Sequence, residues 1–193
     1  MIVVKVGGSL YNTPELTLWL SALVEYSTQQ SIIIVPGGGP FADQVRTAQT
    51  VHHFNDEVAH HMAIIAMKQF GLLLQSHMPT CQPISTYEKP KTPLSIWLPD
   101  DELLAEPSLA KSWDISSDSL ALWLSNQLNA EQLLLIKRAP IHTTSVKVLS
   151  SQSIIDSGFI SLFSKHPATV KVINYQTSAH LADSISNPNL TLI

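Results

Sequence analysis

The chain has 193 residues, of which 45% are hydrophobic and 13% are charged, and its formal net charge is −4. This length and composition indicate one ordinary globular domain and exclude a disordered chain. The acidic balance argues against a general nucleic-acid-binding protein, which would carry a basic face. The single cysteine, Cys81, excludes an internal disulfide and a cysteine-based zinc site.

Composition also yields expectations about partners and location. The low content of charged residues leaves apolar surface, which predicts a homodimer or a higher homo-oligomer. No apolar run approaches the roughly 18 residues that a membrane-spanning helix needs. The start of the chain reads as a strand rather than as a signal peptide. We therefore expect a cytoplasmic protein without a membrane partner.

The N-terminal part of the chain is predicted to alternate strands and helices. Each strand is a short apolar run, and the helices begin at capping residues or prolines. Thr13-Pro14-Glu15 caps the first helix, and Asn55 caps the longest one. The expected elements are a strand at 2–6, a helix to about 26, a strand at 31–35, a helix at about 40–50 and a long helix from 55 to about 74.

The rest of the chain continues this alternation in shorter pieces. Several prolines between residues 78 and 93 predict a loop or an isolated edge strand there, and Ser116-Ser117-Asp118 is predicted to cap a helix. The alternation predicts an α/β fold with a mainly parallel sheet, in which ligands bind beyond the carboxyl ends of the strands. The expected elements are a strand at 94–98, a short helix at 100–106, a helix from the cap to about 128, a strand at 133–136, apolar segments at 154–163, 170–173 and 190–193, and a helix near 178–185.

Glycine is concentrated at the ends of the first two strands. Gly7-Gly8 follows the first strand and Gly37-Gly38-Gly39 follows the second, so the two clusters hold five of the seven glycines. A glycine-rich turn between a strand and a helix lets bare backbone N–H groups approach an anion. Two such turns indicate two anionic groups held close together, an arrangement suited to phosphoryl transfer. The alternative at each position is a tight or strained turn without a ligand.

Lys5 lies within the first apolar strand, where a buried ammonium is costly without an anionic partner. Together with Gly7, Gly8 and Ser9 it predicts a phosphate-binding group, although the spacing is not that of a P-loop. The alternative is a structural lysine whose charged end reaches the edge of the sheet.

Other charged residues fall near the same predicted edge. Asp43 and Arg46 lie about one turn into the helix after the second glycine cluster, where Arg46 can clamp a phosphate. Asp118 can orient Lys5, and Lys137 can stabilise charge on the leaving phosphate. The alternative for Asp43 and Arg46 is a solvated helix face. For Asp118 it is an N-cap, and for Lys137 it is an exposed basic pair with Arg138.

Four histidines lie between residues 52 and 61, but no carboxylate triad accompanies them, so no metal site is expected. The adjacent pair His60 and His61 offers a contact to the substrate, and we assign this contact to His61.

These motifs together resemble the amino-acid kinase superfamily, which includes acetylglutamate, aspartate, uridylate, carbamate and isopentenyl phosphate kinases. The matching residues are Lys5-Val6-Gly7-Gly8-Ser9, Gly37-Gly38-Gly39 and the segment from Asp118 to Ala121. The resemblance covers roughly residues 2–137 and implies a three-layer αβα sandwich. It also implies ATP-dependent phosphoryl transfer, with Mg²⁺ bound mainly by the phosphates of the nucleotide.

A narrower resemblance covers residues 36–46, 59–67 and 116–121. These segments resemble a small branch that belongs to methanofuran-type cofactor biosynthesis in one-carbon metabolism. Its activity is phosphorylation of an aminomethyl-furanylmethyl phosphate to the diphosphate. By resemblance, the outer phosphates of ATP would contact Gly7, Gly8 and Ser9, the acceptor would contact Gly37, Gly38, Gly39, Asp43, Arg46 and His61, and the catalytic residues would be Lys5, Asp118 and Lys137.

The resemblance further implies a single domain over residues 1–193. Residues 1–130 would bind the acceptor and carry catalysis, and residues 131–193 would form a shortened nucleotide-binding part. This second part departs from the family, because it lacks the later Gly-Gly-Met loop and the distal lysine, a role that Lys137 can take. Two alternatives therefore stay open: a non-catalytic small-molecule binding or assembly protein on the same fold, and an amino-acid or nucleotide kinase with another acceptor.

Overall fold

A six-stranded sheet forms the centre of the molecule. The computed structural model describes residues 1–165 and 169–193. Its strands run in the order β3-β4-β2-β1-β5-β6, and every pairing between neighbours is parallel. The predicted α/β class with a mainly parallel sheet is confirmed. The strands are β1 (Ile2–Val6), β2 (Ile32–Pro36), β3 (Gln82–Ile84), β4 (Leu94–Trp97), β5 (Gln132–Lys137) and β6 (Val170–Asn174).

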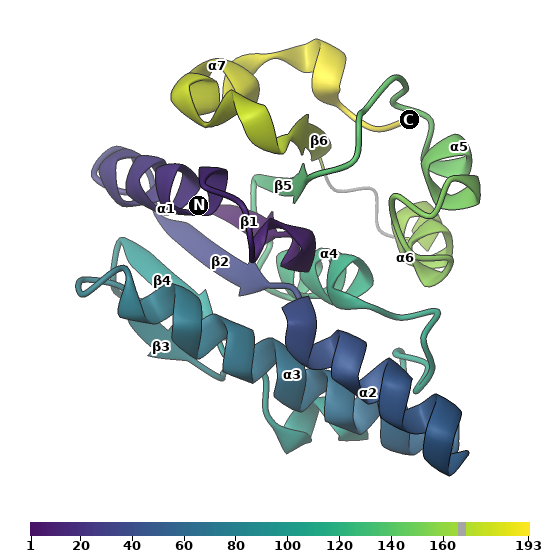
Figure 1. The fold of residues 1–193 in the computed structure, drawn as a ribbon. Helices are drawn as coiled ribbons and strands as arrows, with labels where there is room; N and C mark the ends of the chain where they lie inside the picture. The colour runs from purple at the N-terminus through teal and green to yellow at the C-terminus, as the bar shows by residue number, and fades with distance from the viewer. Residues whose placement is uncertain (166–168) are drawn as a thin grey trace.

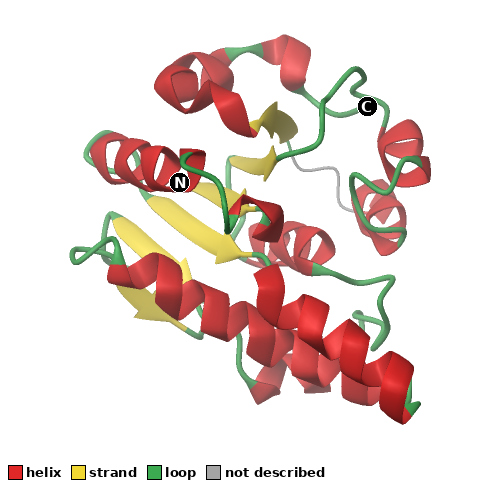
Figure 2. Cartoon of the chain, in the orientation of Figure 1, coloured by secondary structure: helices red, strands yellow, loops and turns green. Residues whose placement is uncertain are grey.

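Helices cover both faces of this sheet, which makes the three layers of the predicted sandwich (Figures 1 and 2). No described helix has the length and apolar character needed to cross a membrane. The helices are α1 (Glu15–Tyr26), α2 (Gly39–His52), α3 (Asp56–Ser76), α4 (Ser117–Gln127), α5 (Val146–Ser151), α6 (Gly158–Lys165) and α7 (Leu181–Ser186), with 3₁₀ turns at Gly8–Leu10, Asp101–Ala105, Tyr175–His180 and Pro188–Leu190.

The two faces of the sheet hold separate hydrophobic cores. One core packs α4, α5 and α6 against the sheet, and the other packs α1 and α7 against the opposite face. The long helix α3 contributes to both: Ile64 and Met67 belong to the first core, and Phe70 and Leu74 belong to the second.

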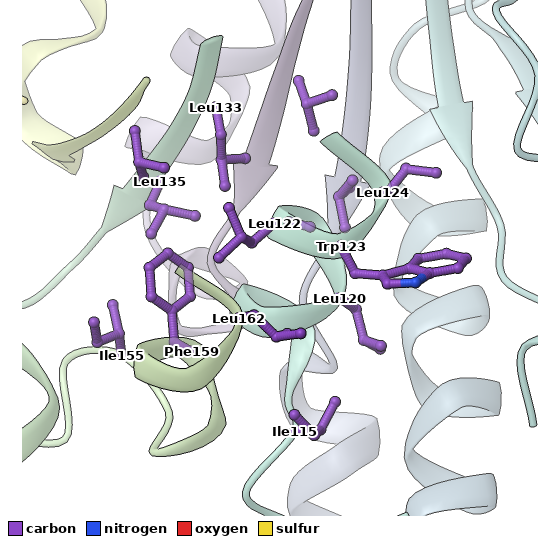
Figure 3. Close-up of a cluster of buried hydrophobic side chains, with 14 of the residues drawn as sticks. Ile115, Leu120, Leu122, Trp123, Leu124, Leu133, Leu135, Ile155, Phe159 and Leu162 are labelled. Atoms are coloured by element: carbon purple, nitrogen blue, oxygen red, sulfur yellow. The ribbon is translucent and has the colours of Figure 1, made fainter. Parts of the chain in front are cut away.

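The first core holds α4 firmly. Nearly every residue of this helix is buried, because β5 covers one side of it and α6 covers another. Figure 3 shows Leu122 of α4 beside Leu133 and Leu135 of β5, with Phe159 of α6 close by. The first turn of α4 is therefore fixed in position by packing, and that turn carries Asp118.

Three local predictions need correction. Pro14 itself stands at the N-cap of α1, and no side chain caps that helix, because the Thr13 hydroxyl donates to Leu10 O instead. Residues 82–84 are not an isolated strand: β3 pairs with β4 at the edge of the sheet, where Pro83 is tolerated because an edge strand has a free side. Ser116 stands at the N-cap of α4 as predicted, but its side chain does not cap the helix. Its hydroxyl donates instead to the carboxylate of Asp156, at 2.6 Å.

Candidate active site

The two glycine clusters meet backbone to backbone at the carboxyl edge of the sheet. A Cβ atom on Gly8 would collide with the backbone nitrogen of Gly39, and a Cβ atom on Gly37 would collide with the backbone nitrogen of Gly8. Gly39 also has φ +55°, a left-handed conformation that side chains rarely adopt. Glycine is required in both loops because each occupies the space that a side chain on the other would need.

The glycines do not all offer free donors. The N–H of Gly7 donates to Ile136 O at 3.2 Å, and the N–H of Gly37 donates to Val6 O at 2.9 Å. Both bonds tie the loops to the strands. In contrast, Gly8, Gly38 and Gly39 line a cavity, and Gly39 begins α2, whose first N–H groups have no partner within the helix. Among the predicted glycines, the N–H groups of Gly7 and Gly37 are therefore not free to bind an anion.

Lys5, Asp118 and Lys137 form one buried charged cluster beside these loops. Lys5 Nζ lies 2.8 Å from Asp118 Oδ1, and Lys137 Nζ donates to Asp118 Oδ2. Lys5 and Asp118 are each 4% exposed, and Lys137 is 8% exposed. The structure therefore places one carboxylate between two ammonium groups that come from the ends of adjacent strands, β1 and β5.

At this cluster, burial and the neighbouring opposite charges shift the pKa values of Asp118 and Lys137 in opposite directions. Burial by itself would raise the pKa of Asp118, but the nearby charges of Lys137 and Lys5 outweigh it and lower the pKa to about 2. Burial lowers the pKa of Lys137 to about 8, although the attraction of Asp118 opposes the shift. Asp118 is ionised at neutral pH, and Lys137 carries a charge that it loses just above neutral pH. The cluster has a net positive charge near pH 7 and suits an anionic ligand.

Asp156 belongs to the same site and was not among the predicted residues. Its carboxylate accepts hydrogen bonds from the backbone N–H of Ser116 at 2.9 Å, of Ser119 at 3.1 Å and of Phe159 at 2.9 Å, and from the hydroxyls of both serines. One carboxylate thereby serves the N-termini of α4 and α6. Burial and the charge of Asp118 raise its pKa. No local motif marks it, since its partners in α4 lie 37 and 40 residues away.

Two cavities lie at this site, and the first is enclosed by the glycine loops, α3 and the segment before α4. Its volume is about 240 Å³, which is below the roughly 300–1,000 Å³ of pockets that hold drug-sized ligands. Arg46 lies at its wall with Cζ 3.6 Å from the centre of the Trp113 ring, and Trp113 Nε1 donates to Gln49 at 2.7 Å. The lining residues are Gly8, Ser9, Gly38, Gly39, Ala42, Asp43, Arg46, His60, Ala63, Ile64, Met67, Trp113, Ile115, Ser116, Ser117 and Leu120.

The second cavity, of about 320 Å³, opens beside the charged cluster and is lined by Asp118, Lys137 and Asp156 among others. Arg46 and Trp113 line both cavities, so they stand between them. The two cavities adjoin at Arg46, Trp113 and Ser116, and two members of the charged cluster line the second of them, so the site has space for two neighbouring ligands.

The histidines are placed differently from the prediction. His61 Nε2 lies 3.0 Å from Asp101 Oδ1, on the protein surface, and His61 does not line the first cavity. Its neighbour His60 does line the cavity and is 5% exposed. Adjacent residues on a helix point about 100° apart, so the sequence could name the pair but not the member that faces inward. Among the described residues, no three histidine, cysteine or acidic side chains gather as a metal site would require.

Comparisons with known proteins agree with this architecture. The sequence profile described as the Amino acid kinase family matches residues 1–183. A curated relative, the [5-(aminomethyl)furan-3-yl]methyl phosphate kinase of Methanocaldococcus jannaschii, is 32% identical over 144 residues, which span 70% of this chain but only 64% of the relative.

Solved structures extend the comparison to the fold. Uridylate kinase from Archaeoglobus fulgidus superimposes with a TM-score of 0.74 at 12% identity, covering 98% of this chain and 97% of the other. UMP kinase from Ureaplasma parvum gives 0.69 at 14% identity, covering 99% and 96%. At such low identities these likenesses concern the fold alone.

Proposed function

The chain belongs to the amino acid kinase family, and on that basis we propose that it is an ATP-dependent kinase that phosphorylates the phosphate group of a small metabolite. The observation that carries the proposal is the Lys5–Asp118–Lys137 cluster, which adjoins two glycine loops at one edge of the sheet. Phosphoryl transfer asks a protein mainly for alignment and for stabilisation of negative charge, and this arrangement offers both.

The acceptor that we propose is an aminomethyl-furanylmethyl phosphate, which would be converted to its diphosphate in methanofuran-type cofactor biosynthesis. The support is the curated relative, whose name specifies [5-(aminomethyl)furan-3-yl]methyl phosphate and which shares 32% identity with this chain. The size of the first cavity, about 240 Å³, favours an acceptor of this scale. An acceptor phosphate needs no strong general base, because its attacking oxygen is already ionised.

The role that we propose for each residue follows from its position in the site. We propose that the acceptor occupies the first cavity with its phosphate near Gly38 and Gly39, and that Asp43 and Arg46 contribute to the wall that contacts it. The outer phosphates of ATP would lie by Gly8 and Ser9, with Gly7 supporting their loop through its bond to Ile136. In the transfer an acceptor oxygen bonds to the γ-phosphorus, the bond from that phosphorus to the β–γ bridging oxygen breaks, and ADP leaves.

In this scheme the charged cluster stabilises the reacting phosphates. Lys5 and Lys137 would each offer N–H donors to the transferred group, and Asp118 would hold both ammonium groups in place. When bound, ATP with Mg²⁺ supplies the phosphoryl group and partly neutralises its charge. Asp118 is ion-paired to two lysines and so is a poor magnesium ligand, which fits a metal held mainly by the phosphates of the nucleotide.

The proposal also assigns regions and assembly. Residues 1–130 would bind the acceptor and carry most of the catalytic machinery, and residues 131–193 would bind the nucleotide beside the second cavity. We further propose a homo-oligomer, because the exposed side of α3 carries Val58, Ile65 and Leu72 at intervals of seven residues, each at least 45% exposed. Sedimentation velocity would test this, and Ile65→Glu would be expected to give monomers.

The test of the function is a kinase assay with the purified protein. ATP, Mg²⁺ and the aminomethylfuran phosphate are expected to give ADP and the diphosphate, detected by ³¹P NMR. Calorimetry with ATP–Mg²⁺ separates the alternatives. Absence of heat at millimolar nucleotide would favour a binding or assembly protein. Nucleotide binding with turnover of amino acids or UMP, and not of the furan, would favour a kinase with another acceptor.

A further inference from the structure

His60 is held in one tautomer by the backbone. Its Nδ1 lies 3.2 Å from the carbonyl oxygen of Ser112, and a carbonyl oxygen can only accept, so Nδ1 must carry the hydrogen. Burial lowers the pKa of His60 and outweighs the hydrogen bond to Ser112, which raises it, so the neutral ring is favoured. A neutral ring with its hydrogen on Nδ1 presents a lone pair on Nε2.

That lone pair has no partner in the part of the chain that the structure describes. Among the described residues none forms a hydrogen bond with His60 Nε2, and this atom is not one of the fully buried polar atoms. Because the side chain lines the first cavity and Nε2 keeps some exposure, we infer that Nε2 faces this cavity. An acceptor-only nitrogen in a small cavity is satisfied by a ligand that donates a hydrogen bond.

The position of His60 along α3 indicates which end of a bound acceptor its Nε2 would contact. Gly39 lies against the ring of Phe70 on α3, and His60 precedes Phe70 by ten residues on the same helix. At a rise of 1.5 Å per residue the two levels are about 15 Å apart along the helix axis, and the α3 residues that line the cavity, from His60 to Met67, span about 10 Å of it. The glycine loops therefore mark the phosphate end of the cavity, and His60 marks the end remote from it. Between them the α3 wall is apolar, made by Ala63, Ile64 and Met67.

We propose that His60 is a specificity-determining residue whose Nε2 accepts a hydrogen bond from the amino group at the end of the acceptor remote from its phosphate. The inference rests on the proposed function, since it takes the acceptor to be the aminomethylfuran phosphate. A planar, apolar ring would then lie along the apolar α3 wall. Of the cavity's charged side chains, the carboxylate of Asp43 offsets the guanidinium of Arg46, so a cationic amine is tolerated there.

The test compares two acceptors on two proteins. One acceptor is the aminomethylfuran phosphate, and the other is its desamino analogue, in which a methyl group replaces the aminomethyl group. His60→Asn is the informative variant, because its amide nitrogen can still donate to Ser112 O while no acceptor remains at the place of Nε2. We expect kcat/KM for the amine to fall by about 10- to 100-fold, as for loss of one hydrogen bond to a charged group. For the analogue kcat/KM should change by less than about threefold.

Two controls isolate the contact. His60→Gln restores an acceptor near the position of Nε2 and should recover much of the preference for the amine. His77→Asn makes the same change at an exposed residue after α3 and should alter neither substrate. Histidine ¹⁵N NMR on the wild type gives a readout without turnover: the Nε2 resonance of His60 should shift when the amine binds and stay in place with the analogue.

The outcomes separate the inference from the function beneath it. Equal losses for both acceptors in His60→Asn, or no loss for the amine, would overturn the role of His60 while leaving the kinase intact. A wild-type protein that binds ATP but phosphorylates neither furan compound would overturn the proposed acceptor, and the amine contact with it. A preference of the wild type for the amine that disappears in His60→Asn supports both.

Discussion

The two sides of the candidate site are built in different ways. The glycine-loop side uses backbone: two loops interlock, and each loop is a short run of residues that are adjacent in sequence. The opposite side uses side chains brought from far apart, since Asp118 meets Lys137 from 19 residues away and Ser116 meets Asp156 from 40 residues away. A local motif can therefore specify the shape of a phosphate site, whereas its charge balance depends on the whole sheet.

The largest expected effect comes from removing the charge that links the two sides. Lys5→Ala should lower kcat by about 10²–10³, as for loss of one preorganised charge-stabilising donor, because the transferred group loses an ammonium and Asp118 loses a partner. Steady-state kinetics on purified protein measures this. Lys147→Ala removes an exposed lysine of α5 and serves as the matched control. A near wild-type rate in Lys5→Ala would remove Lys5 from the mechanism.

Asp156→Ala tests whether the side of the site that is built from distant residues also stabilises the fold. Several donors at the starts of α4 and α6 would lose their acceptor, so the free energy of unfolding should fall by about 2–4 kcal/mol. Urea denaturation measures the change. Asp156→Asn keeps an oxygen acceptor and should lose about half as much. The control is Asp183→Ala, at an 86% exposed carboxylate. Equal stability of Asp156→Ala and wild type would contradict the role.

The smallest effect, and the most specific to the charged side, is a pH dependence. Since Lys137 has a pKa near 8 in the folded protein, kcat/KM should decline as the pH rises through about 8, reaching roughly a tenth of its plateau one unit higher. Lys137→Arg keeps its charge, so its alkaline decline should move to higher pH. A profile that declines at the same pH in both proteins would assign the titration to another group.

Unfolding of the protein at alkaline pH is not expected to cause this decline in kcat/KM. The folded pKa of Lys137 is lowered from 10.5 to about 8, so between these values the unfolded chain binds more protons than the folded one. The contribution of Lys137 to the free energy of unfolding therefore rises with pH across this window. Thermal unfolding followed at each pH separates loss of charge from loss of structure.

Local signals predicted much of the fold. The expected first helix ends at Tyr26 as observed, and Asn55 caps α3 by accepting a hydrogen bond from Val58 N at 3.0 Å. Buried parallel strands, such as β1 and β2, are short apolar runs bounded by glycine or proline, which makes them easy to recognise. The bounds of α2 differ from the prediction by one or two residues, and α7 begins three residues later than expected. The helix expected at 100–106 is a 3₁₀ turn, and α5 was not predicted.

The site was predictable only in part, for physical reasons. Lys5 was identifiable because a charge inside an apolar strand demands a partner, and the structure supplies Asp118. Asp156 gave no such signal, because the groups that donate hydrogen bonds to its carboxylate are serine hydroxyls and backbone N–H groups, which are common everywhere in the chain. The inward position of His60 depends on how α3 rotates against the sheet, and the stacking of Arg46 on Trp113 depends on a loop. These are tertiary properties without a local pattern.

The long helix α3 has a consequence for how the molecule loses its structure. A sheet with a separate core on each face could in principle melt one layer at a time. Here a single rigid helix places Ile64 and Met67 in one core and Phe70 and Leu74 in the other. Loss of structure in either layer would expose part of α3 to solvent. The other layer would then lose the packing that α3 provides. We therefore expect the two layers to unfold together, in a single cooperative transition.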